Sequence, residues 1–348
     1  MTAIIPNVKV YMKNNAINTR PGMAGKIAVI GAFKTTTVTT PTVYTNLDDA
    51  QTALGTDDTF NGCAVLPYLF KGASSILAVN IATESSGTWT KTINPTNLGT
   101  ALASIKGEDW DILFVADTLT DAFITLIDTY LDSVFEMKLP AGFTGCLNGT
   151  TSANVTSANK CGEHCYGVIT QSFTVNDNVL TLLQSIAYYT GLIAGMNVGN
   201  TMTMKTVDGV TALNSELSFE TGGDGKTLLE AGVTTFRCAN RGEGRFICVN
   251  SEQPNGYDLY INRVRDFVIK EFALHKFLGE RNRQATLNEI EHMLASTKEK
   301  CVTDLDLLED IEYHVVKKNA NCVDVYIDSL TFAGLITEID VYVTIEVE

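Results

Sequence analysis

Positive charge and long apolar runs are both scarce in this sequence, and each shortage argues against a class of protein. Only 19% of the 348 residues are charged, and 40 acidic side chains outnumber 25 basic ones, which leaves a net charge of −15. Nucleic-acid phosphates need a basic protein face, so we expect no nucleic-acid partner. The same acidity disfavours adsorption to anionic membrane surfaces.

Apolar runs are too short for a membrane span, which needs roughly 18 consecutive apolar residues. The longest candidate, SIAYYTGLIAGM from Ser185, is predicted to be a buried helix. The opening residues, MTAIIPNVKVYMKNN, lack the basic and apolar regions of a signal peptide. We therefore expect no membrane insertion, synthesis in a cytoplasm, and eight reduced cysteines. Hydrophobic residues make up 45% of the chain, enough for a sizeable core.

Strand-like and helix-like segments alternate through the first two thirds of the chain. GKIAVIGAF is predicted to be a buried strand, and Asn46 is placed to cap a helix over residues 47–54 that Gly55 would end. This alternation predicts an α/β fold with a largely parallel or mixed sheet flanked by helices. After residue 235 two amphipathic helices precede the strands IEYHVV and VDVYID, which predicts a C-terminal α+β domain. We expect an N-terminal arm (1–19), an outer domain (20–235), an inner domain (236–336) and a C-terminal arm (337–348).

The stretch TGGDGKTLLE, residues 221–230, raises the question of a nucleotide site. A phosphate-binding loop reads G-x-x-x-x-G-K-[ST], and its glycines let backbone N–H groups converge on phosphate oxygens. The first glycine is missing here, because Glu220 stands in its place and brings a negative charge. The preceding segment, NSELSFE, is also too polar for a buried strand. A glycine-rich turn that leads into a helix near Lys226 is the better interpretation.

Other reactive residues form no recognisable catalytic or metal motif. CGEHC places Cys161, His164 and Cys165 together, but zinc sites usually combine C-x₂-C pairs with a second pair at a distance. Neither a G-x-S-x-G elbow nor an H-E-x-x-H helix occurs. We expect no catalytic residue, cofactor or metal, although a site assembled from distant residues stays open.

The order of segments resembles the contractile tail sheath proteins of phages, R-type bacteriocins and related injection machines. GKIAVIGAFKTTTVTTPTVYTNLDDAQTALG is similar to the opening of that family, and AVLPYLFKGASSILAVNI to the helix and glycine turn that follow. The stretch from AYYTGLIAGM to EAGVTTF resembles its central signature, where GGDGKTLLEAGV occupies a turn and a helix. YINRVRDFVIKEF and IDSLTFAGLITEIDVYVTIEV resemble its closing elements.

This resemblance implies a structural subunit, not an enzyme. Copies would polymerise helically around an inner tube, and contraction would drive that tube through a target envelope. The implied partners are other copies, the tube protein, and baseplate and tail-terminator proteins. The implied location is a phage tail or a phage-tail-like particle assembled in a host bacterium.

Two sets of residues are candidate assembly contacts. The terminal arms alternate apolar with polar residues, and in the family such arms lend strands to neighbouring subunits. A basic N-terminal arm beside an acidic C-terminal arm could pair between subunits. The apolar arm positions are Val8, Val10, Met12, Ile339, Val341, Val343, Ile345 and Val347. The family also contacts its tube through a late helix, here residues 285–300, whose charged face holds Glu289, His292, Lys298, Glu299 and Lys300.

Two other functions remain open on the sequence alone. One is a cytosolic α/β enzyme with a small-molecule pocket at the carboxyl edge of its sheet, where such folds bind ligands. The other is a different self-assembling protein, such as a tube or capsid subunit. The helix-rich middle disfavours a tube subunit, which in these machines is typically a small β-barrel.

Overall fold

The computed structural model describes residues 25–137, 139–240, 245–272, 277, 283–319 and 322–333. The chain divides into two compact units, with the division after Leu278. The first unit contains a six-stranded sheet, and the second contains a two-stranded sheet. None of the helices in these ranges has the length and apolarity that a membrane crossing requires.

The main sheet is mixed, as predicted. Its order is β2-β3-β1-β6-β7-β8, in which only β2 runs antiparallel to its neighbour. This is the doubly wound arrangement, since the second parallel strand lies on one side of the first and the later ones on the other. The strands are β1 (Lys26–Gly31), β2 (Thr42–Tyr44), β3 (Ser75–Asn80), β6 (Ile112–Thr118), β7 (Gly142–Cys146) and β8 (Cys165–Ile169).

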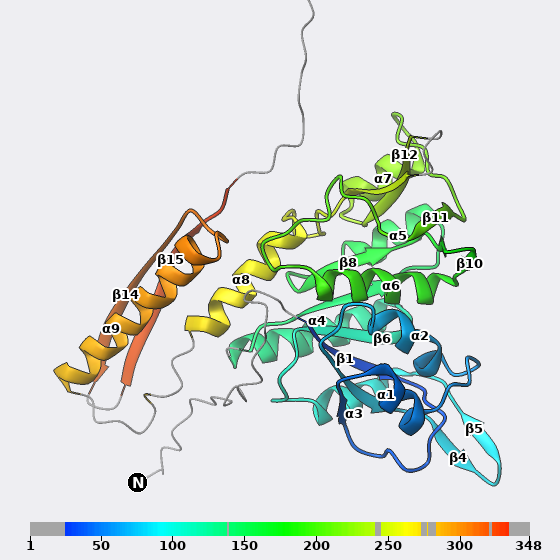
Figure 1. The fold of residues 1–348 in the computed structure, drawn as a ribbon, viewed down its shortest axis with the longest axis horizontal. Coiled ribbons are helices and arrows are strands. Elements are labelled where there is room, and N and C mark those ends of the chain that lie inside the picture. Colours follow the sequence, from blue (N-terminus) through cyan, green and yellow to red (C-terminus); the bar gives the residue numbers. More distant parts are fainter. Residues whose placement is uncertain are drawn as a thin grey trace, which may run out of the picture. The chain divides into compact units, whose positions relative to one another are not determined.

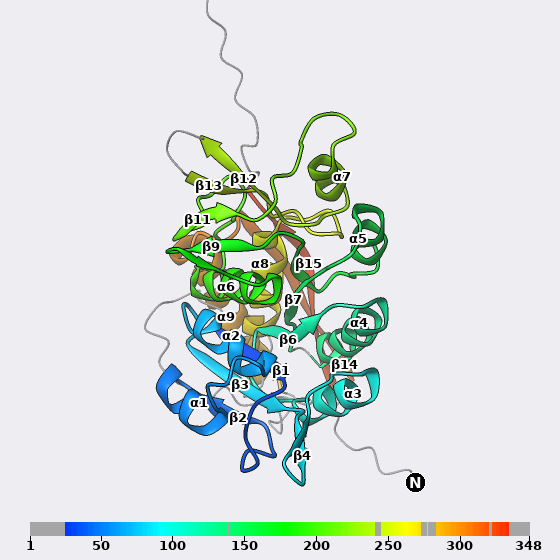
Figure 2. The same cartoon turned by 90° about the vertical axis from the view of Figure 1, so that its right-hand side faces the viewer.

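Helices cover both faces of this sheet, as Figure 2 shows. Alternate residues of β1 point to opposite faces, so Ile27 and Val29 join one core while Ala28 and Ile30 join the other. The helices packed on the first core are α1 (Leu47–Leu54), α2 (Asn61–Leu69) and α6 (Leu182–Gly195). Those packed on the second core are α3 (Pro95–Ser104), α4 (Asp121–Glu136) and α5 (Thr151–Ala158).

Local sequence signals set several of these boundaries. The Asn46 side chain accepts a 2.9 Å hydrogen bond from the Asp49 N–H and so caps α1. Gly55 ends the helix at φ 94°, a conformation that favours glycine. The predicted bounds of this helix are confirmed.

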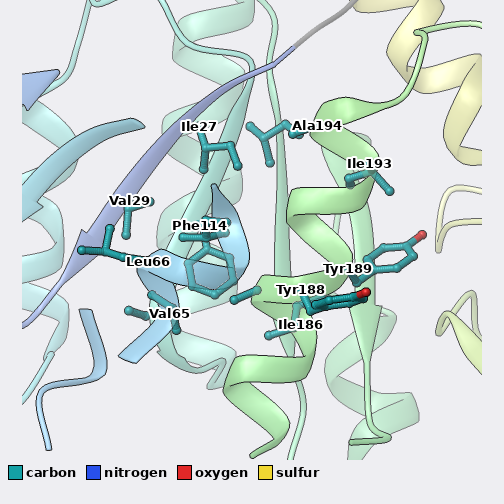
Figure 3. Packing of buried hydrophobic residues seen from close by; sticks show 14 of the residues in the cluster. Ile27, Val29, Val65, Leu66, Phe114, Ile186, Tyr188, Tyr189, Ile193 and Ala194 are labelled. Carbon is teal, nitrogen blue, oxygen red and sulfur yellow. The ribbon is translucent and has the colours of Figure 1, made fainter. Parts of the chain in front are cut away.

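Helix α6 is the buried segment that the apolar run predicted. Its side chains Ile186, Tyr188 and Ile193 belong to the first core, and Figure 3 shows Ala194 of the same helix beside Ile27. Glycines bring its backbone close to α2, because a Cβ added at Gly191 would lie 2.2 Å from the Tyr68 carbonyl oxygen. This close approach requires residues without a side chain.

Smaller strands and helices complete the first unit. The helices are α7 (Asp224–Glu230) and α8 (Leu259–Phe272). The strands β9 (Phe173–Val175), β10 (Asn178–Val179) and β11 (Val210–Leu213) form one sheet, while β4 (Thr83–Ser85) with β5 (Thr88–Thr90) and β12 (Thr235–Asn240) with β13 (Arg245–Asn250) form hairpins.

Buried polar contacts fix α8 to the first unit. The guanidinium of Arg263, 2% exposed, donates to the carbonyl oxygens of Met196 (3.1 Å) and Asn197 (3.3 Å) at the end of α6. Lys270 Nζ donates to Asp111 Oδ1 at 2.7 Å, just before β6. These contacts belong to the first compact unit, which ends at Leu278. The division into an outer domain (20–235) and an inner domain (236–336) stays a prediction from the sequence.

The second unit is small and has its own core. Helix α9 (Gln284–Glu299) continues into a π-helical turn (Lys300–Asp304) and leads to β14 (Asp310–Asn319) and β15 (Cys322–Thr331). Figure 1 shows α9 lying along the two antiparallel strands. Ile290, Leu294 and Ile311 are buried between the helix and the strands.

We predict that Gly191→Ala destabilises the first unit by about 1–3 kcal/mol, the usual cost of forcing extra atoms into a packed core. The new methyl group would meet backbone oxygens of α2, which cannot rotate away as a side chain could. The matched control is Gly99→Ala in α3, where the nearest atom would lie 3.8 Å away. Thermal and denaturant unfolding should show a loss for Gly191→Ala only, and equal effects would contradict the close helix contact.

We also predict a pH-dependent contribution from Asp111. Burial alone raises the pKa of its carboxyl, but Lys270 and Lys26 outweigh that effect and hold the pKa below its ordinary value. A carboxyl with a lowered folded-state pKa stabilises the protein above its unfolded pKa, near 4, and the benefit disappears as pH falls through the folded value.

Asp111→Asn should therefore cost about 1.5–3 kcal/mol at pH 7, the range for a hydrogen bond to a charged group. The gap to the wild type should shrink below about pH 4. Asp109→Asn removes a neighbouring exposed carboxylate that pairs with Lys26 and serves as the control. A gap at Asp111 that stays constant down to pH 2 would rule out this linkage.

Candidate functional site

The glycine-rich stretch forms a closed turn. The N–H groups of Gly225 and Lys226 donate to the Ser218 carbonyl oxygen at 2.8 and 3.3 Å. Lys226 Nζ lies 3.8 Å from Glu230 Oε1, one turn further along α7. A phosphate-binding loop directs such N–H groups and its lysine at a ligand. In this chain they serve the turn and the short helix that the sequence predicted.

The Cys161, His164 and Cys165 side chains are buried and engaged in other contacts. His164 Nε2 lies 3.1 Å from Asp132 Oδ1, and Cys165 Sγ lies 3.5 Å from Gln253 Oε1. A hydrogen bond with Cys165, together with burial, raises the pKa of the Cys161 thiol, which disfavours the thiolate that binds metals. In the described ranges no three His, Cys, Asp or Glu side chains are arranged to hold a metal ion.

An open pocket of about 670 Å³ lies at the carboxyl end of β3, beside the start of α3. This is the edge where the alternative enzyme function would place its substrate. Its lining supplies amides, hydroxyls and apolar groups, without a titratable side chain to act as general acid or base. The lining residues are Thr39, Pro41, Val79, Asn80, Ile81, Asn94, Pro95, Thr96, Asn97, Thr100, Ala101 and Ser104.

The chain itself fills the point between β1 and β6 where the strand order reverses. Doubly wound proteins bind ligands in the crevice at this point. Here the Gly62 N–H donates to the Ala32 carbonyl oxygen at 2.9 Å, which brings the start of α2 onto the end of β1. A Cβ added at Gly31 would lie 2.9 Å from both Gly62 Cα and Ala116 Cβ, so no ligand fits between them.

In the second unit, α9 has the two faces that its sequence predicted. Ile290 and Leu294 are buried, whereas Glu289, His292 and Glu299 are exposed on the opposite side. Lys298 and Lys300, placed by the sequence on the same charged face, are half-buried instead. Lys298 Nζ lies 2.6 Å from Asp310 Oδ1 at the start of β14, so its charge also helps hold the unit together.

The β14–β15 hairpin turns one face away from α9. His314 lies opposite Tyr326 in the register, and their rings stack with centroids 4.7 Å apart. His314 Nδ1 is 2.6 Å from Asp328 Oδ2, and the Tyr326 hydroxyl donates to Asp324 Oδ2 at 3.2 Å. These contacts place the four side chains on one surface, which we call the outer face.

Within the described residues the hairpin is a sheet of two strands, so it has two outer edges. Each strand is ten residues long, enough to pair with an extended segment along its whole length. Sequence reasoning predicted both strands but did not identify them as a place where other strands could be received. The sequence signal that could have identified them is the alternation of apolar and polar residues, which both strands share with the two arms.

The arm residues themselves, from Val8 to Met12 and from Ile339 to Val347, lie outside the described residues. Their sequence pattern remains the basis for their predicted role. Helix α9, which the sequence predicts to face a tube, and the hairpin are therefore the described parts of the candidate assembly surface.

Comparison with solved structures links this architecture to known proteins. A sheath tail protein from Listeria innocua matches with a TM-score of 0.68 at 12% identity, over 90% of this chain and 95% of that one. A sheath tail protein from Desulfitobacterium hafniense matches with a TM-score of 0.68 at 11% identity, over 93% and 98%. The helical sheath of the anti-feeding prophage in its contracted state matches with a TM-score of 0.66 at 14% identity, over 96% and 98%.

No family model matches the sequence, and no curated protein matches it. At these identities the likeness shows the fold, and it extends along nearly the whole of each chain. The resemblance drawn from the order of sequence segments is confirmed at that level: this polypeptide has the fold of contractile tail sheath proteins.

Proposed function

We propose that this protein is the subunit of a contractile tail sheath. The observation that carries the proposal is the near full-length likeness to sheath proteins, which includes a sheath in its contracted state. We propose that copies polymerise helically around an inner tube and that contraction drives the tube through a target envelope. Assembly in a host bacterial cytoplasm, into a phage tail or a phage-tail-like particle, follows from this role.

Contraction requires two arrangements of the same subunits that differ in free energy. Rigid units that reorient about their connections supply such a pair of states, because packed cores do not deform continuously. The first unit has a sheet buried on both faces, which suits a body that moves without rearranging. A baseplate would trigger the change, and a tail-terminator protein would close the far end.

The arms and the hairpin together could connect neighbouring subunits while the rigid units reorient during contraction. We propose that arms from neighbouring copies add as strands to the edges of β14 and β15. Strand addition uses main-chain hydrogen bonds for affinity and alternate side chains for specificity. An edge that receives a neighbour's strand is also protected from uncontrolled aggregation. The proposed order of the domains along the sheath radius is outer for residues 20–235 and inner for residues 236–336.

We propose that the exposed face of α9 contacts the tube. Glu289, His292 and Glu299 are available on that face, whereas Lys298 has Asp310 as a partner within the unit. Exposed ion pairs contribute only about 0–1 kcal/mol each, so the contact would depend on repetition along the tube. The acidic character of the face predicts a tube surface with basic side chains.

The direct test of the proposed function is negative-stain microscopy of the purified full-length protein over a range of concentrations. We expect rings or striated hollow cylinders, because strand exchange between copies propagates without limit. A discrete globular particle at every concentration would instead favour the enzyme, and closed shells would favour a capsid subunit. Turnover of a small molecule by the globular form would settle the choice for the enzyme.

The tube contact predicts a charge-reversal effect. Glu289→Lys with Glu299→Lys should leave empty sheaths intact but reduce the fraction that contains a tube, since the contact face changes sign. The control is Glu309→Lys, the same charge change in the same unit on an exposed residue just before β14. Micrographs of sheath and tube co-expressed would report the filled fraction. Equal filling for both variants would place the tube contact elsewhere.

A further inference from the structure

The open pocket beside α3 is a cavity that has no part in the proposed sheath function. Its volume of 670 Å³ falls within the range of about 300–1,000 Å³ that is typical of small-molecule sites. Thr39 and Pro41, the carboxyl end of β3 and the first turns of α3 form its walls. Figure 2 shows β2, the β4–β5 hairpin and α3 grouped at this end of the first unit. Doubly wound folds bind small ligands at this edge of the sheet.

Hydrogen bonds hold one wall of the pocket in place. Asn80 Oδ1, at the end of β3, accepts from the N–H groups of Phe33 (3.0 Å) and Ala82 (2.9 Å). The amide of Asn80 donates to the Thr35 carbonyl oxygen at 3.2 Å and so fixes the loop that precedes β2. The wall is therefore preformed, which lowers the cost of ordering it around a ligand.

The N–H groups at the start of α3 are already bound within the protein. Asn94 Oδ1 accepts from the N–H groups of Thr96 and Asn97, both at 3.0 Å. Asn97 Oδ1 accepts from the Asn94 N–H at 2.8 Å. This capping box satisfies the groups that bind anions at other helix N-termini. The helix start thus shapes the pocket without making it an anion site.

The chemistry of the lining excludes two classes of ligand. Among the described residues that form it, none is acidic or basic. A phosphate, carboxylate or ammonium group would lose water there without gaining an opposite charge, which is unfavourable. A wholly apolar ligand would cover hydroxyls and amides and deprive them of water as a hydrogen-bond partner. Neutral ligands with many polar groups remain.

The lining offers neutral donors and acceptors together with apolar surface. The hydroxyls of Thr39 and Thr96 can donate and accept, and the amide N–H groups of Asn94 can donate. Thr100 and Ser104 donate their hydroxyls to carbonyl oxygens of α3, at 3.1 and 2.7 Å, and each oxygen keeps lone pairs that can accept. Apolar side chains from the end of β3 and from α3 complete the lining.

We propose that this pocket binds a neutral oligosaccharide. A sugar ring carries hydroxyls, which both donate and accept, and an apolar face of C–H groups, so it matches a lining of this mixed and uncharged kind. The net gain from each neutral hydrogen bond is small, so one site binds weakly. In a sheath the pocket would repeat in every subunit, and multivalent attachment can exceed the affinity of one site by about 10²–10⁴. This multivalent step rests on the proposed sheath function, whereas the pocket itself does not.

An array of immobilised sugars, probed with the labelled full-length protein, tests the assignment. It carries neutral trimers of glucose, galactose, mannose and N-acetylglucosamine, and an acidic trimer of galacturonic acid. We expect binding to at least one neutral trimer and none to the acidic one. The affinity should not change with salt, because the lining has no charge to screen. Binding to the acidic trimer alone, or to no trimer, would overturn the proposal.

A pocket-filling variant locates the site. Thr100→Trp places an indole in the pocket from an exposed position of α3 and should weaken the neutral trimer at least about tenfold. The matched control is Thr125→Trp in α4, where the threonine is also exposed and donates its hydroxyl to the carbonyl oxygen one turn earlier, at 3.0 Å. Thermal melts establish that both variants are folded. Equal affinity for the two would place sugar binding outside this pocket and refute the assignment.

A second variant removes donors without filling the pocket. Asn94→Asp keeps the cap of α3, since Asp caps a helix as well as Asn does, but it exchanges the amide donors for a carboxylate oxygen. We expect the neutral trimer to bind at least about threefold more weakly and the melting temperature to stay within error. An unchanged affinity would show that Asn94 does not contact the sugar and would contradict the proposed lining.

Assembly and sugar binding are measured separately. If the wild-type protein never polymerises but binds a neutral trimer as described, the sheath function fails and the pocket assignment holds. If Thr100→Trp abolishes polymer while no trimer binds the wild type, the pocket is an interface between copies and the proposal is overturned. If polymer and unassembled protein hold a trimer-coated surface equally well, the multivalent attachment is refuted.

Discussion

The need of every strand edge for a main-chain partner is the constraint on which this architecture depends. A strand leaves one row of N–H and C=O groups without a partner wherever its sheet stops. In the six-stranded sheet of the first unit, the four inner strands β3, β1, β6 and β7 have a hydrogen-bonded neighbour on each side. In the described residues the second unit has two strands and one long helix, and isolated two-stranded sheets are marginally stable. Completing that sheet with strands from other copies would couple subunit stability to assembly.

The contacts of α8 show to which of the two units this helix belongs. Arg263 binds the carbonyl end of α6, and Lys270 binds Asp111 before β6, so α8 is part of the first unit. A buried arginine is costly to desolvate, and burial lowers the pKa of the Arg263 guanidinium. Its carbonyl partners and the negative end of the α6 dipole offset that cost.

Local signals predicted the elements well because their causes are local. Asn46 and Gly55 determine the ends of α1, and the period of apolar residues determines the burial of α6 and the two faces of α9. The unit boundary was not predictable in this way. Arg263 and Lys270 appear in the sequence as ordinary charges on an amphipathic helix, and their partners lie 66 and 159 residues away. The same limit applies to Lys298, whose partner Asp310 becomes visible only when the hairpin folds back on α9.

Weak exposed charges can direct a strong link when main-chain hydrogen bonds supply the affinity. Each backbone bond adds roughly 0.5–1.5 kcal/mol, whatever the sequence of the added strand. Such bonds cannot choose between two arms, two edges or neighbouring registers. Alternating side chains make that choice, since a shift of one residue exchanges the apolar and charged faces. The charged side chains that alternate along the proposed arms would therefore contribute little to total stability and much to selection. In a repeating lattice the same selection operates at every subunit. A strand added one residue out of register would lose both its charge pairs and its apolar contacts.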